Sequence, residues 1–276
     1  MVEWLAGNRL RGTSTERTSS TGFNVVIGGW KEVGRTTLGS AGSNIEVSSL
    51  PDKRYYQILM DTHGSGGNAN WLGRIGNGTV DTGSNYARRQ SQDGGSDATS
   101  TSTSTFFEHF SASQLPRFGV QYIANLSGKE KLGIGHFVNA NTAGAGTAPY
   151  QRMEVANKWV NTSNPMDVFR LQDDNALQNF GTGSEVVVLG WDPADTHTSN
   201  FWEELASVEL GSASDTLSSG TITAKKYLWV QYYTKNSGNV ETKCRFNSDS
   251  GSNYAFKWSE DGGSDVTYTS QTECDR

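Results

Sequence analysis

A long internal repeat constrains the fold of this chain more than any other feature of its sequence. Shifting the 276-residue sequence by 172 positions places residues 30–66 on residues 202–238, with 11 identities over 37 positions. A shift of 168 places residues 83–105 on residues 251–273, with 14 identities over 23 positions. The second match contains the phrases GSNYA and DGGSD in both copies. Matches of this length at a nearly constant offset indicate a duplicated structural unit.

The second copy matches only the first part of the first copy. Strand-like segments such as FGVQYIANL, KLGIGHFV, YQRMEVANKW and EVVVLGW have no counterpart after residue 273. The sequence therefore predicts an N-terminal arm over residues 1–28, a complete unit over residues 29–195 and a partial second unit over residues 196–276. Three hypotheses arise for the partial unit: it takes strands from another chain, the natural chain is longer, or it packs against the first unit.

The apolar patterns predict an all-β chain. FGVQYIANL and KLGIGHFV alternate apolar and other residues on either side of the short connection SGKE, which predicts a hairpin. EVVVLGW is a continuous apolar run, which predicts a strand buried on both faces. The 32 Gly, with frequent Ser, Thr, Asn and Asp between the runs, supply turns. We predict an antiparallel β-sandwich that resembles a jelly roll.

The composition argues against several function classes. A net charge of -6 and a pI near 5.3 provide no basic field, so we predict no nucleic-acid partner. No stretch approaches the roughly 18 apolar residues of a membrane span, and the N-terminus lacks the apolar run of a secretory signal. We therefore predict synthesis in the cytoplasm and no membrane partner. The two cysteines, Cys244 and Cys274, predict thiols or at most one disulfide.

The sequence carries no recognisable catalytic motif. The four histidines are far apart in the sequence, with no G-x-S-x-G or H-E-x-x-H pattern near them: His63, His109, His136 and His197. Glu203 with Glu204, or Asp173 with Asp174, would act on a glycoside only at a suitable separation in space. Glu204 also matches Glu32 as part of a repeated strand start. We predict a non-enzymatic protein without catalytic residues, with a glycan-active hydrolase as the weaker alternative.

Turn-like segments of the second copy suggest a cation site. Carboxylate and amide oxygens at loop spacing suit calcium, and the candidate ligands are Asn247, Asp249, Asn253, Asp261 and Asp265. The competing explanation is structural, because Asp and Asn side chains close turns onto the backbone and glycine adopts positive φ. Calcium aside, the sequence predicts no cofactor.

Aromatic side chains in the second copy suggest a sugar-binding platform. The candidates are Trp229, Tyr232, Tyr233 and Trp258. At the matching positions the first copy has Gln57, Met60, Asp61 and Gln90. Exposed aromatic faces stack on sugar rings, whereas large aromatics in strands usually belong to the core. Both interpretations stay open at this point.

Several phrases resemble a group of uncharacterised proteins associated with marine viral sequences, in which tandem copies of such a unit occur. They are GW.E....LGSA, DKRYY with AKKYL, GSNYA with DGGSD, and NANTAGAGTAP followed by GWDPADTHT. The resemblance covers the chain from about residue 29 onward. It implies a virus or phage structural protein at the capsid surface, tail or fibre of the virion, and it brings no family active site. The implied partners are other virion proteins or further copies in a homo-oligomer, and a carbohydrate-binding module for host glycans is the alternative.

Overall fold

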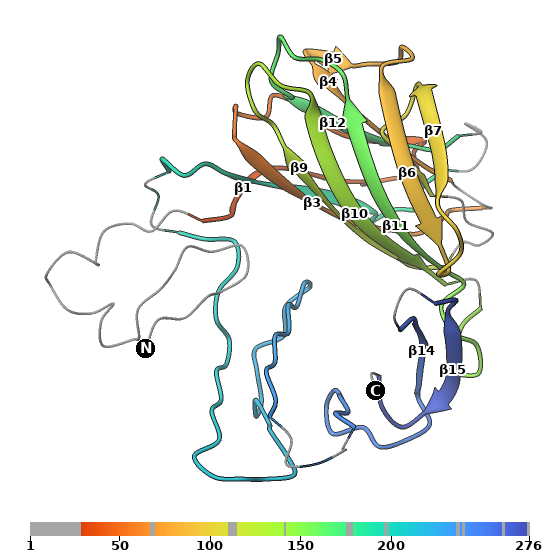
Figure 1. Ribbon diagram of the computed structural model, residues 1–276, viewed down its shortest axis with the longest axis vertical. Coiled ribbons are helices and arrows are strands. Elements are labelled where there is room, and N and C mark those ends of the chain that lie inside the picture. Colours follow the sequence, from red (N-terminus) through yellow and green to blue (C-terminus); the bar gives the residue numbers. More distant parts are fainter. Residues whose placement is uncertain are drawn as a thin grey trace, which may run out of the picture.

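The protein is an all-β molecule in its computed structural model (Figure 1). The structure describes residues 29–66, 70–109, 115–140, 142–174, 179–195, 197, 199–235, 238, 241–260 and 263–274. Within these residues every regular element is a strand and every strand pairing is antiparallel. The predicted antiparallel β-sandwich is confirmed. The predicted N-terminal arm, residues 1–28, lies outside the described residues.

The larger sheet of the sandwich has eight strands drawn from both ends of the first unit. Their spatial order is β1 (Lys31–Thr37), β13 (Glu185–Trp191), β3 (Tyr55–Thr62), β9 (Arg117–Ala124), β10 (Lys131–Asn139), β11 (Gln151–Trp159), β6 (Tyr86–Gln92) and β7 (Ala98–Thr103). The predicted hairpin is confirmed as β9 and β10. The continuous apolar run forms β13, and Val186, Val187 and Val188 are fully buried between β1 and β3.

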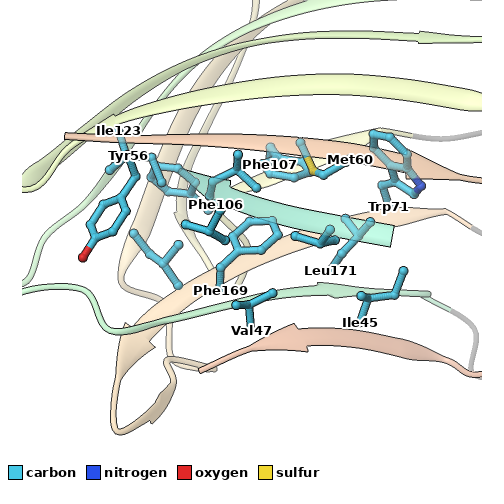
Figure 2. Packing of buried hydrophobic residues seen from close by; sticks show 14 of the residues in the cluster. Ile45, Val47, Tyr56, Met60, Trp71, Phe106, Phe107, Ile123, Phe169 and Leu171 are labelled. Atoms are coloured by element: carbon cyan, nitrogen blue, oxygen red, sulfur yellow. The ribbon is translucent and has the colours of Figure 1, made fainter. Parts of the chain in front are cut away.

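The smaller sheet covers one face of the larger sheet. It contains β2 (Asn44–Val47), β12 (Val168–Gln172), β4 (Trp71–Asn77) and β5 (Thr79–Val80), with β8 (Phe107–His109) beside β4. Apolar side chains from both sheets meet between them (Figure 2): Ile45, Val47, Tyr56, Met60, Trp71, Phe106, Phe107, Ile123, Phe169 and Leu171. The ring of Phe137 lies 4.7 Å from that of Phe107, measured between centroids. Removing this apolar surface from water is the main stabilising contribution to the unit.

Strands β9 and β10 direct their apolar alternate residues away from the core. Phe118, Leu132 and Ile134 are 41, 55 and 58 % exposed. The opposite side of β9 presents the buried Gly119 to the smaller sheet, and a Cβ there would come within 2.5 Å of the Phe137 ring. Glycine therefore makes room for a core aromatic ring. Alternation shows which residues share a face, and only the packing decides which face is inside.

Replacing Gly119 with alanine tests this close approach. We expect Gly119→Ala to lower the free energy of unfolding by about 1–3 kcal/mol, because the added methyl overlaps the ring of Phe137. Urea denaturation measures the change. The control is Gly39→Ala, whose added Cβ meets nothing within 4 Å. An equal loss in both variants would contradict the packing explanation.

Among the described residues after 199, in the second copy, the regular strands form one hairpin. It consists of β14 (Tyr254–Trp258) and β15 (Val266–Gln271), drawn in dark blue in Figure 1. At the repeat offset of 168 these strands match β6 and β7. The register shifts between Tyr254 and Phe256 in the second hairpin, as it does between Tyr86 and Arg88 in the first.

The two copies also share individual hydrogen bonds. Arg74 Nε donates to the carbonyl of Ser104 at 2.9 Å, and Arg245 Nε donates to the carbonyl of Thr272 at 2.9 Å. Three further pairs of bonds correspond in the same way: Phe106 N to Gly73 O and Cys274 N to Cys244 O; Ser91 Oγ to Gly95 O and Ser259 Oγ to Gly263 O; Tyr86 OH to Asp81 O and Tyr254 OH to Asp249 O. The repeated sequence is therefore a repeated local structure.

The strand order explains why the second copy forms so little sheet. In the first unit, β1 to β7 come from the repeated part of the sequence, and β8 to β13 come from the part without a counterpart. β13 lies between β1 and β3, β12 between β2 and β4, and β9 to β11 between β3 and β6. The direct pairs within the repeated part are β6 with β7 and β4 with β5. A second copy without the other strands has almost no neighbours to pair with.

Candidate functional site

The second copy contacts the outer face of the larger sheet through aromatic side chains. Together they form what we call the outer aromatic cluster: Trp30, Tyr55, Tyr122, Trp191, Phe201, Trp202 and Tyr227. Trp202 Nε1 donates to Gln57 Oε1 at 3.0 Å, and Gln57 Nε2 donates to the hydroxyl of Tyr122 at 3.0 Å. The backbone N–H of Phe201 donates to the carbonyl of Trp30 at 2.7 Å. These bonds hold the start of the second copy against β3 and β9.

Glu185 at the start of β13 anchors the second copy electrostatically. Its carboxylate accepts hydrogen bonds from Tyr227 OH at 2.9 Å and Lys226 Nζ at 3.1 Å. It also accepts one from Thr37 Oγ1 at 2.7 Å and pairs with Arg35 at 2.8 Å. Burial alone would raise the pKa of Glu185, but the four hydrogen-bond donors lower it to about 2. The anchor is therefore ionised at neutral pH.

A second contact joins the two copies of the DGGSD phrase. The backbone N–H of Asp265 donates to the carbonyl of Asp93 at 3.2 Å, and the Arg152 guanidinium pairs with the Asp265 carboxylate at 2.7 Å. Lys257 Nζ donates to Asp93 Oδ1 at 2.8 Å. Burial would raise the pKa of Asp93, but the hydrogen bond from Lys257 helps to lower it. In Figure 1 this contact lies where β15 meets the lower ends of β6 and β11.

The second copy exposes apolar side chains at positions that form the core of the first copy. Three core residues of β3 are each 0 % exposed: Tyr56, Ile58 and Met60. Their counterparts at the offset of 172 are 48, 56 and 52 % exposed: Leu228, Val230 and Tyr232. Leu217 is 43 % exposed and corresponds to the fully buried Ile45 at the same offset. Phe246 is 48 % exposed, and it follows Arg245 as the fully buried Ile75 follows Arg74, the two arginines that make matching hydrogen bonds. We call these five side chains of the second copy the acceptor face.

The predicted sugar-binding residues lie on two separate segments. Trp229 and Tyr233 are 40 and 90 % exposed on the segment that matches β3, and the Trp229 ring lies 5.5 Å from that of Trp202. Tyr232 belongs to the acceptor face. Trp258 is half-buried in β14, where it pairs with Val266 of β15. A platform formed by all four rings stays a prediction.

Three of the five predicted calcium ligands, Asp249, Asn253 and Asp265, have protein partners in the structure. Asp249 accepts hydrogen bonds from Asn253 Nδ2 at 3.2 and 3.1 Å, which closes the turn before β14. Asp265 pairs with Arg152, and Asn247 has a positive φ of 53°. The remaining predicted ligand lies outside the described residues: Asp261. In the described part of the chain, no three His, Cys, Asp or Glu side chains gather as a metal site.

The residues considered for catalysis have structural surroundings. Asp173 is fully buried and accepts the backbone N–H of Asn70 at 2.9 Å, and Glu203 pairs with Lys225 at 2.5 Å. Cys244 and Cys274 are both free thiols. They lie close together, and the backbone N–H of Cys274 donates to the Cys244 carbonyl at 3.0 Å. An open polar depression of about 370 Å³ is lined by Asp81, Asn85, Trp159 and residues 160–164.

Comparisons with known proteins found no match among protein-family models, curated proteins or solved structures. Among the described residues, no helix is long and apolar enough to cross a membrane. The argument for function therefore rests on the surfaces and contacts of this chain.

Sequence reasoning missed the outer aromatic cluster and the Glu185 anchor. Trp30 and Trp202 were visible as a matched pair in the repeat, but the pairing suggested equivalent positions and not a contact. In the structure both join one cluster on the same sheet face. Glu185 looked like the polar start of an apolar run, and its partners Lys226 and Tyr227 come from the second copy. No local pattern signals contacts across such separations.

Removing the charge of Glu185 should loosen the second copy. We expect Glu185→Gln to lower the free energy of unfolding by about 2 kcal/mol at pH 7 and to speed amide exchange at residues 225–229. Because the folded pKa is about 2 against an ordinary 4.5, this stabilisation is present above pH 4.5 and is lost as the pH falls toward 2. The control Glu154→Gln alters a carboxylate that is 51 % exposed and should change little. A pH-independent deficit would contradict the electrostatic anchor.

His109 should contribute a separate pH dependence. Its buried ring stacks on Phe137, and burial with the nearby Arg117 charge lowers its pKa from 6.5 to about 4. The unfolded chain therefore binds the extra proton between these values, so the free energy of unfolding falls as the pH drops from 6.5 to 4, by on the order of 3 kcal/mol. We expect His109→Phe to remove this slope in urea titrations. His136→Phe, at a side chain 66 % exposed, should retain it.

Proposed function

We propose that this chain is a non-enzymatic structural protein of a virion, at the capsid surface, tail or fibre, and that it acts by assembling with other proteins. The observation that carries the proposal is the acceptor face, because its side chains occupy core positions of a repeated unit yet lie open to solvent. Fully burying a side chain of this size contributes about 1.5–3 kcal/mol. Several such side chains together give a strong driving force for association.

A second apolar surface supports assembly independently. Phe118, Leu132 and Ile134 stand on the outer face of β9 and β10, and each is more than 40 % exposed. We call these three side chains the β9–β10 patch. The Phe118 ring lies 6.1 Å from that of Tyr227, so the patch adjoins the docked second copy. A flat apolar sheet face beside an occupied one is a suitable contact for a further copy of the chain.

The virion part of the proposal draws on the repeated phrases that resemble marine viral proteins. An all-β chain with many turns suits a structural component of a virion. A virion component also works through contacts between chains, for which the two exposed apolar surfaces are suited. GSNYA leads into the first strand of a hairpin in both copies, β6 with β7 and β14 with β15, and it therefore contributes to scaffold geometry.

Glycan binding by the second copy is the alternative function. Trp229 and Tyr233 correspond to Gln57 and Asp61 of β3. On the outer side of the larger sheet, Gln57 donates to the Tyr122 hydroxyl and Asp61 pairs with Lys226. Tyr233 is 90 % exposed, so its face is open to a sugar ring. The exposure of Trp229 and Tyr233 therefore favours glycan binding at these two of the four predicted aromatic residues.

Light scattering on a sizing column tests the assembly proposal. We expect the purified chain to form a defined oligomer well above its 29.9 kDa monomer mass. Substituting Ile134→Asp should shift the equilibrium toward monomer by at least about tenfold in dissociation constant, because it places a charge within the contact. The control His136→Asp changes an exposed residue two positions further along the same face and should leave the mass unchanged.

A monomer at every concentration would contradict assembly through copies of this chain. If that monomer were also retained on a glycan array, and Tyr233→Ala abolished the retention, the result would favour the carbohydrate-binding function. If the unmodified chain and Tyr233→Ala were retained equally on the array, glycan binding at this site would be contradicted.

A further inference from the structure

The fold of the second copy brings the two cysteines of the chain together, although 30 positions separate them in the sequence. The backbone N–H of Cys274 donates to the Cys244 carbonyl oxygen at 3.0 Å, and the Cys274 Sγ donates to the same oxygen at 3.3 Å. Strand residues joined by backbone hydrogen bonds have Cα atoms about 5.5 Å apart in antiparallel pairing. Disulfides join cysteines whose Cα atoms are about 4.4–6.8 Å apart. The two thiols therefore lie on segments that a disulfide can bridge.

The residues beside both cysteines hold these two segments against each other. Arg245 Nε donates to the carbonyl of Thr272 at 2.9 Å. On the other side of Cys244, the ammonium of Lys243 pairs with the Glu273 carboxylate at 3.0 Å. Bringing the ends of a long loop together costs entropy, and here the fold has already brought them together. A bond between the thiols therefore forms without ordering the loop anew.

The matching positions of the first copy make the same backbone bond with different side chains. The N–H of Phe106 donates to the carbonyl of Gly73 at 2.8 Å. Phe106 is fully buried, and its ring lies 6.1 Å from that of Tyr86. A Cβ at Gly73 would come within 2.2 Å of the Phe107 ring. Core aromatic packing thus stabilises this junction in the first copy, whereas the second copy has a thiol on each side of it.

We propose that Cys244 and Cys274 form a reversible disulfide within the chain, and that this bond stabilises the second copy where core packing stabilises the first. The bond closes a loop that contains β14 and β15. The loop also contains Asp265, which pairs with Arg152 of the first unit at 2.7 Å. Closing a loop removes entropy from its unfolded state and so favours the folded hairpin. The proposal does not depend on the proposed assembly function.

The bond forms by thiol–disulfide exchange with a low-molecular-weight disulfide such as glutathione disulfide. One cysteine thiolate attacks a sulfur of glutathione disulfide, which gives a mixed disulfide and releases one glutathione thiolate. The other cysteine thiolate then attacks the protein sulfur of the mixed disulfide and releases the second glutathione. The two cysteine sulfurs lose two electrons, glutathione disulfide gains them, and the two thiol protons end on the two glutathione molecules. Both cysteine side chains are partly exposed, so the oxidant can reach them.

Redox titration of the unmodified full chain tests whether the fold brings the thiols together. The chain is equilibrated in glutathione buffers with an increasing share of the disulfide form, quenched with acid, alkylated and analysed by intact-mass spectrometry. The same series is run in urea that unfolds the chain. We expect an intramolecular disulfide, seen as the loss of two hydrogen atoms per chain. Its equilibrium constant of formation should be at least about tenfold larger in the folded chain than in urea.

The two equilibrium constants also measure the stabilisation. By linkage, their ratio equals the factor by which the disulfide favours the folded over the unfolded chain. The 276-residue sequence contains two cysteines, so the intramolecular disulfide has one possible pairing. A linked peptide in a non-reducing digest identifies it. Separate glutathione adducts on the two cysteines, a disulfide that joins two chains, or an equilibrium constant that urea leaves unchanged would each overturn the inference.

Amide exchange tests what the bond does to the second copy. Oxidation should slow exchange in β14 and β15 by at least about tenfold, because opening this hairpin then leaves a closed loop. The matched control is the corresponding hairpin of the same molecule, β6 with β7, where exchange should stay within about twofold. Cys274→Ser cannot form the bond, so the oxidant should leave its exchange in β14 and β15 unchanged. No slowing in the unmodified chain, equal slowing in both hairpins, or the same slowing in Cys274→Ser overturns the inference.

Discussion

Antiparallel pairing between interleaved strands is the constraint on which the rest of this structure depends. In the larger sheet, β1, β3 and β6 each pair with a strand from the β8 to β13 half of the first unit, and in the smaller sheet β12 lies between β2 and β4. Backbone N–H and C=O groups need partners, so neither half can bury its apolar face alone. In the first unit the two halves supply these partners to each other, whereas the described residues of the second copy match one half.

The contacts between the copies attach the second copy without completing it. The outer aromatic cluster and Glu185 hold its beginning, and Asp93 with Arg152 holds its closing hairpin. Between these anchors the chain leaves Leu228 and Val230 in water. A chain that served only as a stable monomer would gain free energy by covering such side chains. Their exposure is the observation on which the proposed assembly function rests.

Much of the fold follows from local patterns, whereas the candidate surfaces do not. The β9–β10 hairpin and buried β13 were predictable because alternation and a continuous apolar run are local signals. Alternation did not show that Phe118 and Ile134 face outward, since the choice of inner face depends on where Gly119 admits the Phe137 ring. Similarly, no pattern indicated that the two DGGSD phrases touch each other.

By itself, the sequence determined the all-β class, the duplication and the turn at GSNYA in both copies, because these depend on residues close together in the chain. Only the tertiary structure decided which strands lie between which, and therefore why Val230 is exposed while Ile58 is buried. It also decided that Glu185 binds Lys226 and Tyr227. The physical reason is that burial and charge pairing depend on neighbours in space, and sequence order does not specify them.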